Sequence, residues 1–262
     1  MSAIPHADPG RGVFETMLVI AGRAVELDAH IERLSASVEA LYCAPLPERA
    51  CGLVVDRAAE LDRGKLRLTV VPAARAVRLR IEAEKVDPAS IFPAPERAAS
   101  LRSCVIAGGL GEHKWADRDL LDRIAAASPG ELPLLLDADG AVLEASRASV
   151  FAVDGGRLVT PPADGRILPS IARRQAIEVA TAEGIETAEE RLSLADLLGA
   201  EVFLTGSVRG VEPARLLDGT ELAPAGEISV RLAAGLRRRW RAPAAEPVAA
   251  AAGERPGGRL GR

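Results

Sequence analysis

Hydrophobic positions in the first hundred residues follow a period of two, then a helical period, then a period of two again. The first two strands are joined by Ala21-Gly22, a connection of the two-residue hairpin kind, and Asp28 is expected to cap the first helix. Together these elements predict an antiparallel sheet with two helices. Strands are expected at residues 12–20, 23–27, 65–71 and 76–84, and helices at 28–42 and 47–61.

The proline-rich segment 87–99 separates this unit from the rest of the chain and indicates a domain boundary. We therefore expect an N-terminal α/β domain over 1–99 and a larger second domain over 100–241. The segment 242–262 is rich in Ala, Pro and Gly and is expected to be disordered. The fold class predicted is α/β (α+β) with two domains.

Residues 134–173 change from strand to helix periodicity while polar residues stand at fixed points. A hairpin with its turn at Asp137–Gly140 leads to Glu144, a carboxylate at the end of an apolar run, where a cationic partner is expected. After Thr160-Pro161-Pro162, a helix is predicted to open at Leu168-Pro169, with Pro169 in its first turn. Free N–H groups at such a helix start suit a phosphate.

Composition narrows the function classes. The chain has 262 residues, 48% of them apolar, and a net charge of −4 with both signs interspersed, so neither a nucleic-acid face nor a membrane-spanning run is indicated. Three cysteines and three histidines lie without ligand spacing, which argues against a metal site. Residues 1–11 are too short and polar for a secretory signal. A cytoplasmic protein is expected.

Lysine usage points to one candidate reactive amine. Only Lys65, Lys85 and Lys114 occur among 33 basic side chains. Arginine cannot form a Schiff base, whereas a lysine with a lowered pKa can. Lys65 and Lys85 flank predicted strands, but Lys114 lies between a glycine-rich loop and a helix that begins near Asp117. A reactive Lys114 is favoured over an ordinary loop lysine.

The order of these parts resembles the class IV aminotransferase family, the pyridoxal 5'-phosphate (PLP) enzymes of fold type IV. The resemblance is carried by Phe-Glu-Thr, His-x-x-Arg-Leu, the strand ending in Glu, Thr-Pro-Pro and the Leu-Pro helix start. Ser149 stands where Asn is usual. Ser170 and Ala172 replace the usual Gly and Thr, and these two changes predict looser cofactor binding. The family implies a small sheet-and-helix domain and a larger barrel-like domain, and its motifs stand here at 14–16, 30–34, 141–144, 160–162 and 168–173.

The resemblance also implies a role for each site residue. Lys114 would form the Schiff base with PLP and then serve as general base and acid, and Glu144 would keep the pyridine nitrogen protonated. For Arg33 a solvated helix arginine, and for Thr16 an ordinary strand residue, remain alternatives. The phosphate would be held by Arg33, Ile171, Ala172 and Ser207, and the substrate would meet Thr16, Arg147 and Arg209.

The activity implied is that of a small-molecule lyase. Lys114-Trp115-Ala116-Asp117-Arg118 resembles the lyase type, in which 4-amino-4-deoxychorismate gives 4-aminobenzoate and pyruvate for folate synthesis. The alternatives are a transaminase acting on D- or branched-chain amino acids, and a non-catalytic family member. A small amine substrate, a homodimer and an association with a chorismate-processing synthase are the partners expected.

Overall fold

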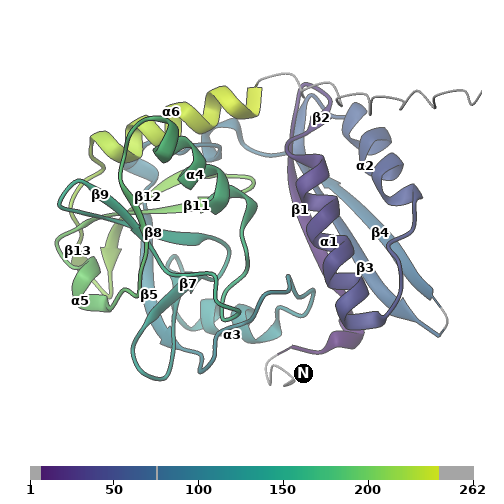
Figure 1. Cartoon of the computed structure of the whole chain (residues 1–262), viewed down its shortest axis with the longest axis horizontal. Coiled ribbons are helices and arrows are strands. Elements are labelled where there is room, and N and C mark those ends of the chain that lie inside the picture. Colours follow the sequence, from purple (N-terminus) through teal and green to yellow (C-terminus); the bar gives the residue numbers. More distant parts are fainter. Residues whose placement is uncertain (1–6, 75, 242–262) are drawn as a thin grey trace, which may run out of the picture.

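The chain folds into two lobes that face each other (Figure 1). This computed structural model describes residues 7–74 and 76–241, so the tail 242–262 predicted to be disordered lies outside the described residues. Among the described residues, no helix is long and apolar enough to cross a membrane.

The small lobe is the predicted antiparallel sheet, with strand order β2-β1-β3-β4 and two helices packed on one face. The first helix begins at Leu27, and its N-cap is Glu26 in the left-handed region (φ 54°) without a side-chain cap, so the cap predicted at Asp28 is wrong. The elements are β1 (Val13–Ile20), β2 (Arg23–Ala24), α1 (Leu27–Tyr42), α2 (Arg49–Ala59), β3 (Arg63–Ala73) and β4 (Ala76–Glu84).

The two faces of this sheet differ in chemistry. On the helix side, Val13, Met17, Leu66 and other apolar residues form a buried core. Because side chains alternate across a strand, the neighbouring positions on β1 and β3 face the other lobe. On the helix side, Glu15 of β1 is the exception among these apolar residues, because it is a buried carboxylate.

The large lobe is built on a nine-stranded mixed sheet curled into a half-barrel. This agrees with the barrel-like second domain that the family resemblance implied. Helices α4 and α6 cover one face of this sheet (Figure 1). On that face the rings of Phe151 and Phe203 stack 5.2 Å apart. The strands are β5 (Ala99–Val105), β6 (Leu132–Leu136), β7 (Val142–Ala145), β8 (Ser149–Asp154), β9 (Arg157–Thr160), β10 (Thr187–Glu189), β11 (Glu201–Gly206), β12 (Gly210–Leu217) and β13 (Thr220–Glu221). The helices are α3 (Asp119–Ala127), α4 (Ile171–Ala182), α5 (Leu194–Leu197) and α6 (Glu227–Arg241), with 3-10 turns at Pro9–Arg11, Pro88–Ser90 and Pro95–Arg97.

The loop between β5 and α3 crosses from the large lobe to the small one. β2 pairs with only the last two residues of β1, which leaves the edge of β1 open near Val13. There Phe14 N–H donates to the Lys114 carbonyl and Ala116 N–H donates to the Gly12 carbonyl, both at 2.9 Å. Trp115 is buried in the small-lobe core. β4 belongs to the small-lobe sheet and β5 to the large-lobe sheet. The domain boundary at residue 99 stays a prediction.

Two adjacent glycines shape the start of this loop. Gly108 and Gly109 both have positive φ, 76° and 69°. A Cβ on Gly109 would stand 2.0 Å from the carbonyl oxygen of Arg166, whereas a Cβ on Gly108 would meet nothing within 4 Å. Gly109 is therefore required by the close approach of two loops, and Gly108 only by its backbone angle.

The pair allows a matched test of this loop contact. Gly109→Ala should lower the free energy of unfolding by about 3 kcal/mol or more, because backbone strain and a backbone clash add. Gly108→Ala should cost about 1 kcal/mol from the left-handed conformation alone. Chemical denaturation of both variants measures the difference, and equal losses would show that the loops do not meet at Gly109.

Candidate active site

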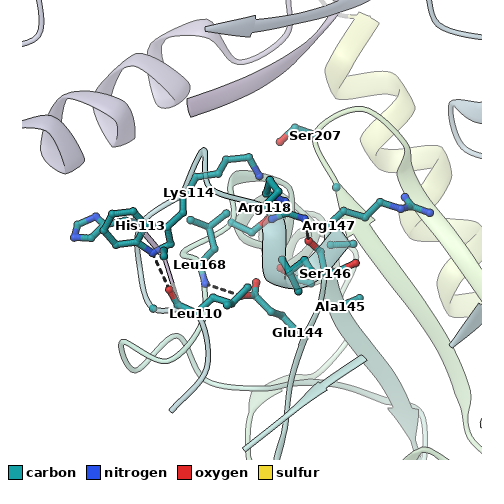
Figure 2. A pocket seen from close by; sticks show the side chains of 18 of the residues that line it. Leu110, His113, Lys114, Arg118, Glu144, Ala145, Ser146, Arg147, Leu168 and Ser207 are labelled. Carbon is teal, nitrogen blue, oxygen red and sulfur yellow. Dashed lines mark hydrogen bonds between the residues drawn. The ribbon is translucent and has the colours of Figure 1, made fainter. Parts of the chain in front are cut away.

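A cavity at the junction of the lobes gathers the side chains of Lys114, Arg118 and Glu144, with Ser207 on a separate loop (Figure 2). Both lobes contribute, since Arg33 of α1 lines the same space. The polar lining residues include Arg33, His113, Lys114, Arg118, Glu144, Ser146, Arg147, Ser149, Ser170, Thr205 and Ser207.

Lys114 is half-buried and reaches into the cavity from the loop paired with β1 (Figure 2). Its Nζ lies 5.0 Å from the centre of the Phe14 ring. Burial first, and then repulsion by Arg33, lower the pKa of Lys114 to about 8, although Glu15 and Glu144 oppose the shift. At pH 7, the Lys114 amine is then neutral in about a tenth of the protein molecules.

Glu144 is buried on β7, and its only hydrogen bond in the described chain comes from Leu168 N–H at 3.4 Å. No cationic side chain of the described residues pairs directly with it, so the cationic partner expected from the sequence stays a prediction. Burial raises the pKa of Glu144 to about 7, while Lys114 and Arg118 act on it through space to lower it. The carboxylate is left with capacity for another donor.

Arg33 is held by a buried carboxylate. Its Nε and Nη2 donate to Glu15 Oε1 and Oε2 at 2.7 and 2.8 Å, and its Nη1 donates to the Pro169 carbonyl at 2.9 Å. The Arg33 side chain is 12% exposed, so a solvated helix arginine does not describe it. Arg33 thus ties the small lobe to the segment that precedes α4.

Glu15, which the sequence analysis did not single out, completes this arrangement. His30 Nδ1 lies 2.7 Å from Glu15 Oε2. Burial acts to raise the pKa of Glu15, but the Arg33 charge and the hydrogen bonds from His30 and Arg33 outweigh it and bring the pKa to about 2. Because an ionised carboxylate only accepts, His30 is the donor. The sequence signal that could have identified Glu15 is a glutamate at a strand position that faces the core. The same argument was applied to Glu144.

The α4 helix begins later than predicted. Ser170 is its N-cap and accepts from Arg173 N–H at 3.3 Å, so Pro169 lies before the helix and not in its first turn. Ser170 has φ −71° and ψ 131°, which any residue adopts, so the replacement of the family's Gly carries no backbone strain here. Ser170 lines the cavity, while Ile171 and Ala172 are not among the described residues that line it.

Two hydroxyl groups at the cavity lack partners. Ser149 on β8 and Thr205 on β11 are opposite each other in the sheet register and are 2% and 0% exposed. Neither Ser149 Oγ nor Thr205 Oγ1 has a hydrogen-bond partner among the described residues. Ser207, two residues after Thr205, also lines the cavity, and its contact with a phosphate stays a prediction. Buried hydroxyls without partners are consistent with a site built to receive a polar group.

A second cavity of about 550 Å³ adjoins the first and shares Lys114, Arg118 and Ser207 with it. All three residues expected to meet substrate, Thr16, Arg147 and Arg209, line this space. So do several side chains that the sequence analysis did not single out. Among them are Phe14 and Arg67, whose guanidinium carbon stands 3.7 Å from the centre of the Phe14 ring.

The residues of the lyase-type pattern have separate tasks. Asp117 accepts from Asp8 N–H at 2.9 Å and pairs with Arg11, so it holds the N-terminal segment against the lysine loop. Arg118 donates to the Ser146 carbonyl at 2.5 Å and lines both cavities. Burial lowers the pKa of Arg118. Arg118 is the member of the pattern besides Lys114 that carries charge into both cavities.

Residues 12–217 match the family model described as amino-transferase class IV, which spans most of the chain. The chain belongs to the class IV aminotransferases. Members of this family are PLP-dependent enzymes, and the protein is therefore a PLP-dependent enzyme. The resemblance noted from the sequence is confirmed.

Relatives of this class IV aminotransferase carry different activities in their names. A bifunctional aminodeoxychorismate lyase / D-amino acid transaminase of Mycobacterium tuberculosis is 29% identical over 265 residues, covering 87% of this chain and 91% of that protein. A putative branched-chain-amino-acid aminotransferase of Methanocaldococcus jannaschii is 41% identical over 101 residues. That match covers only 37% of this chain and 35% of the relative.

Solved structures agree with the fold. A PLP-bound hypothetical aminotransferase from Mycobacterium tuberculosis superposes with a TM-score of 0.77 at 26% identity, covering 92% of this chain and 94% of that one. The 4-amino-4-deoxychorismate lyase from Pseudomonas aeruginosa gives 0.76 at 27% identity, covering 91% and 95%. The half-barrel lobe with a smaller sheet lobe is thus the architecture of the class IV aminotransferases.

The residues present at the cavity fit PLP. A lysine with a lowered pKa suits the aldehyde, a buried carboxylate with spare acceptor capacity suits the ring nitrogen, and unpartnered hydroxyls beside a helix start suit the phosphate. Donors, acceptor and amine therefore occur together in one space.

The lowered pKa of Lys114 has a consequence for stability in the cofactor-free protein. At pH 7 the lysine is charged in the folded and unfolded states, so the full penalty of burying the charge is present. Between the folded pKa of about 8 and the ordinary 10.5, the folded protein releases its proton first and gains stability.

Replacing Lys114 by Met should therefore raise the free energy of unfolding at pH 7 by about 1 to 2 kcal/mol, after allowance for solvent screening. The gain should shrink as the pH rises from 8 to 10.5. Denaturant titrations at pH 7 and 10 measure it, with Lys85→Met at an exposed position as control. A gain that does not change with pH would mean that the Lys114 pKa is ordinary.

Proposed function

We propose that the protein is a PLP-dependent lyase that converts 4-amino-4-deoxychorismate to 4-aminobenzoate and pyruvate. The full-length match to a relative named for both lyase and D-amino acid transaminase activity supports a place in this part of the family. The charge of the second cavity favours the lyase reaction.

That charge is the observation on which the proposal rests. 4-Amino-4-deoxychorismate carries two carboxylates, whereas branched-chain amino acids and D-alanine carry one. Acidic side chains are few around the cavity, and two of them, Glu84 and Asp87, already pair with Lys65 and Arg97 at 2.9 and 2.7 Å. The cationic lining residues are Lys65, Arg67, Lys85, Lys114, Arg118, Arg147 and Arg209, and the acidic ones are Glu84, Asp87 and Glu212.

The same proposal assigns the cofactor contacts. Lys114 would hold the aldehyde carbon, and Glu144 would accept from the ring nitrogen. A cation at that nitrogen would lower the pKa of Glu144 below about 7 and keep it ionised. The phosphate would meet Arg33 and the N–H groups of Ile171 and Ala172 in the first turn of α4, which have no acceptor within the helix. Ser207 would add its hydroxyl group.

PLP supplies an aldehyde that condenses with the substrate amine and a ring that accepts electrons from a breaking bond. Once displaced, the Lys114 amine takes the proton from C4 of the substrate at Nζ, and its lowered pKa leaves it a base near neutral pH. The C–O bond to the enolpyruvyl group then breaks as the ring becomes aromatic. Lys114 would then give the proton to the methylene carbon of the departing enolpyruvate and displace the product amine, so the products are 4-aminobenzoate and pyruvate and no oxidant is consumed.

A transaminase acting on D- or branched-chain amino acids is the second candidate, because relatives carry those names. It would use the same Lys114 and Glu144. The third reading, a non-catalytic family member suggested by Ser149, Ser170 and Ala172, is set aside because the family match makes the protein a PLP-dependent enzyme. The unstrained backbone at Ser170 weakens that reading.

The setting of the enzyme also belongs to the proposal. A homodimer acting on a small amine in the cytoplasm is what the resemblance implies, and the cysteines of the described residues are free, which suits a reducing compartment. The association with a chorismate-processing synthase is proposed from the same resemblance.

Cofactor placement can be tested without turnover. Arg33→Gln combined with Glu15→Gln removes both charges, so that neither is left buried alone. We expect PLP to dissociate at least about tenfold more readily, since a charged hydrogen bond contributes about 1.5 to 3 kcal/mol. Equilibrium dialysis measures this, with Glu39→Gln on an exposed position of α1 as control. Unchanged PLP affinity would place the phosphate away from Arg33.

Product analysis tests the reaction. Incubation with 4-amino-4-deoxychorismate should yield 4-aminobenzoate and pyruvate in equal amounts by chromatography. Glu144→Gln should retain PLP and lose turnover by about two orders of magnitude, because the ring nitrogen loses its anionic partner. Amino-group transfer from D-alanine or a branched-chain amino acid to 2-oxoglutarate, without 4-aminobenzoate, would establish the transaminase instead.

A further inference from the structure

Glu212 on β12 joins two arginines at the wall of the second cavity. Arg147 donates from Nη1 and Nη2 to Glu212 Oε2 and Oε1 at 3.0 and 3.1 Å, and Arg209 donates from Nη2 to Glu212 Oε1 at 2.7 Å. The Glu212 side chain is 3% exposed, whereas those of Arg147 and Arg209 are 41% and 29% exposed. The carboxylate is therefore buried beneath two guanidinium groups that reach solvent.

This cluster carries an excess of one positive charge, because a single carboxylate meets two guanidinium groups. Glu212 binds both nitrogens of one Arg147 fork, which fixes that side chain in the bidentate geometry. Arg209 is held through Nη2 only, and its buried Nε has no hydrogen-bond partner among the described residues. The protein thus supplies fewer acceptors than the two arginines can use.

The position of the cluster relates it to Lys114. Arg147, Arg209 and Glu212 line the same cavity as Lys114 and Ser207, and its volume of about 550 Å³ is in the range of small-molecule sites. In Figure 2 the Arg147 side chain extends away from Glu144 and Lys114. A ligand that bridges Lys114 and the arginines must therefore present its anionic group at a distance from its reacting atom.

We propose that Arg147 and Arg209, bridged by Glu212, form a receptor for a carboxylate remote from the reacting amine of the substrate. The assignment rests on the proposed function for the identity of that substrate. Glu212 reduces the repulsion between the two guanidinium groups, and the remaining unit charge matches one carboxylate. A substrate with two carboxylates is then preferred over one with a single carboxylate next to its amine.

Unreactive ring acids test the receptor apart from catalysis. The PLP-loaded protein is titrated with isophthalate, which has two carboxylates on a six-membered ring, and with benzoate, which has one. Calorimetry should show isophthalate binding at least about tenfold more tightly. Arg209→Gln and Arg147→Gln should each remove most of that preference and change benzoate binding less than about twofold. Arg215→Gln, at an exposed position of β12, the strand of Glu212, should change neither the isophthalate preference nor the binding of benzoate.

Kinetics give an independent reading on the substrate that product analysis identifies. Loss of the receptor should raise KM while kcat is largely kept, because the arginines lie away from the reacting atoms. The proposal is overturned if both arginine variants keep the isophthalate preference, or if the wild type has none. An enzyme that proves to be a transaminase would sink the lyase proposal but would leave the preference for dicarboxylates intact, so the two failures are distinguishable.

Discussion

Two backbone hydrogen bonds between the lysine loop and the edge of β1 hold Lys114 where the two lobes meet. They can form because β2 covers only the last two residues of β1 and leaves the edge near Val13 open. Trp115 then fills the small-lobe core directly after Lys114. The loop therefore follows β5 in the sequence but packs with the small lobe.

Two buried carboxylates show how the surroundings separate a structural role from a chemical one. Glu15 receives three short contacts from Arg33 and His30, and its pKa falls to about 2. Glu144 receives a single N–H at 3.4 Å, and burial raises its pKa to about 7. The first is satisfied within the protein and orients Arg33. The second keeps acceptor capacity, which under the proposed function the ring nitrogen of the cofactor would take up.

The site consists of two adjoining cavities rather than one. Lys114, Arg118 and Ser207 border both, so Lys114 lies between a space suited to the cofactor and a space lined by cations. Arg67 reaches the second cavity from the small lobe, and Arg147 and Arg209 reach it from the large lobe. An anionic substrate in this cavity would therefore contact both lobes, so the distance between the lobes would limit the size of the substrate.

Local patterns were enough to predict the strands and the two helices of the small lobe, and the order of motifs was enough to single out Lys114, Glu144 and Ser207, which line one cavity. Period and turn chemistry act over a few residues, and a family motif is a local string, so both can be read from the chain. The start of α4 after Pro169, the pairing of Arg33 with Glu15 and the bridge from Arg147 to Glu212 depend on residues that packing brings together. Burial and long-range contacts also decide whether a carboxylate is satisfied or available, as Glu15 and Glu144 show, and only the tertiary structure supplies them.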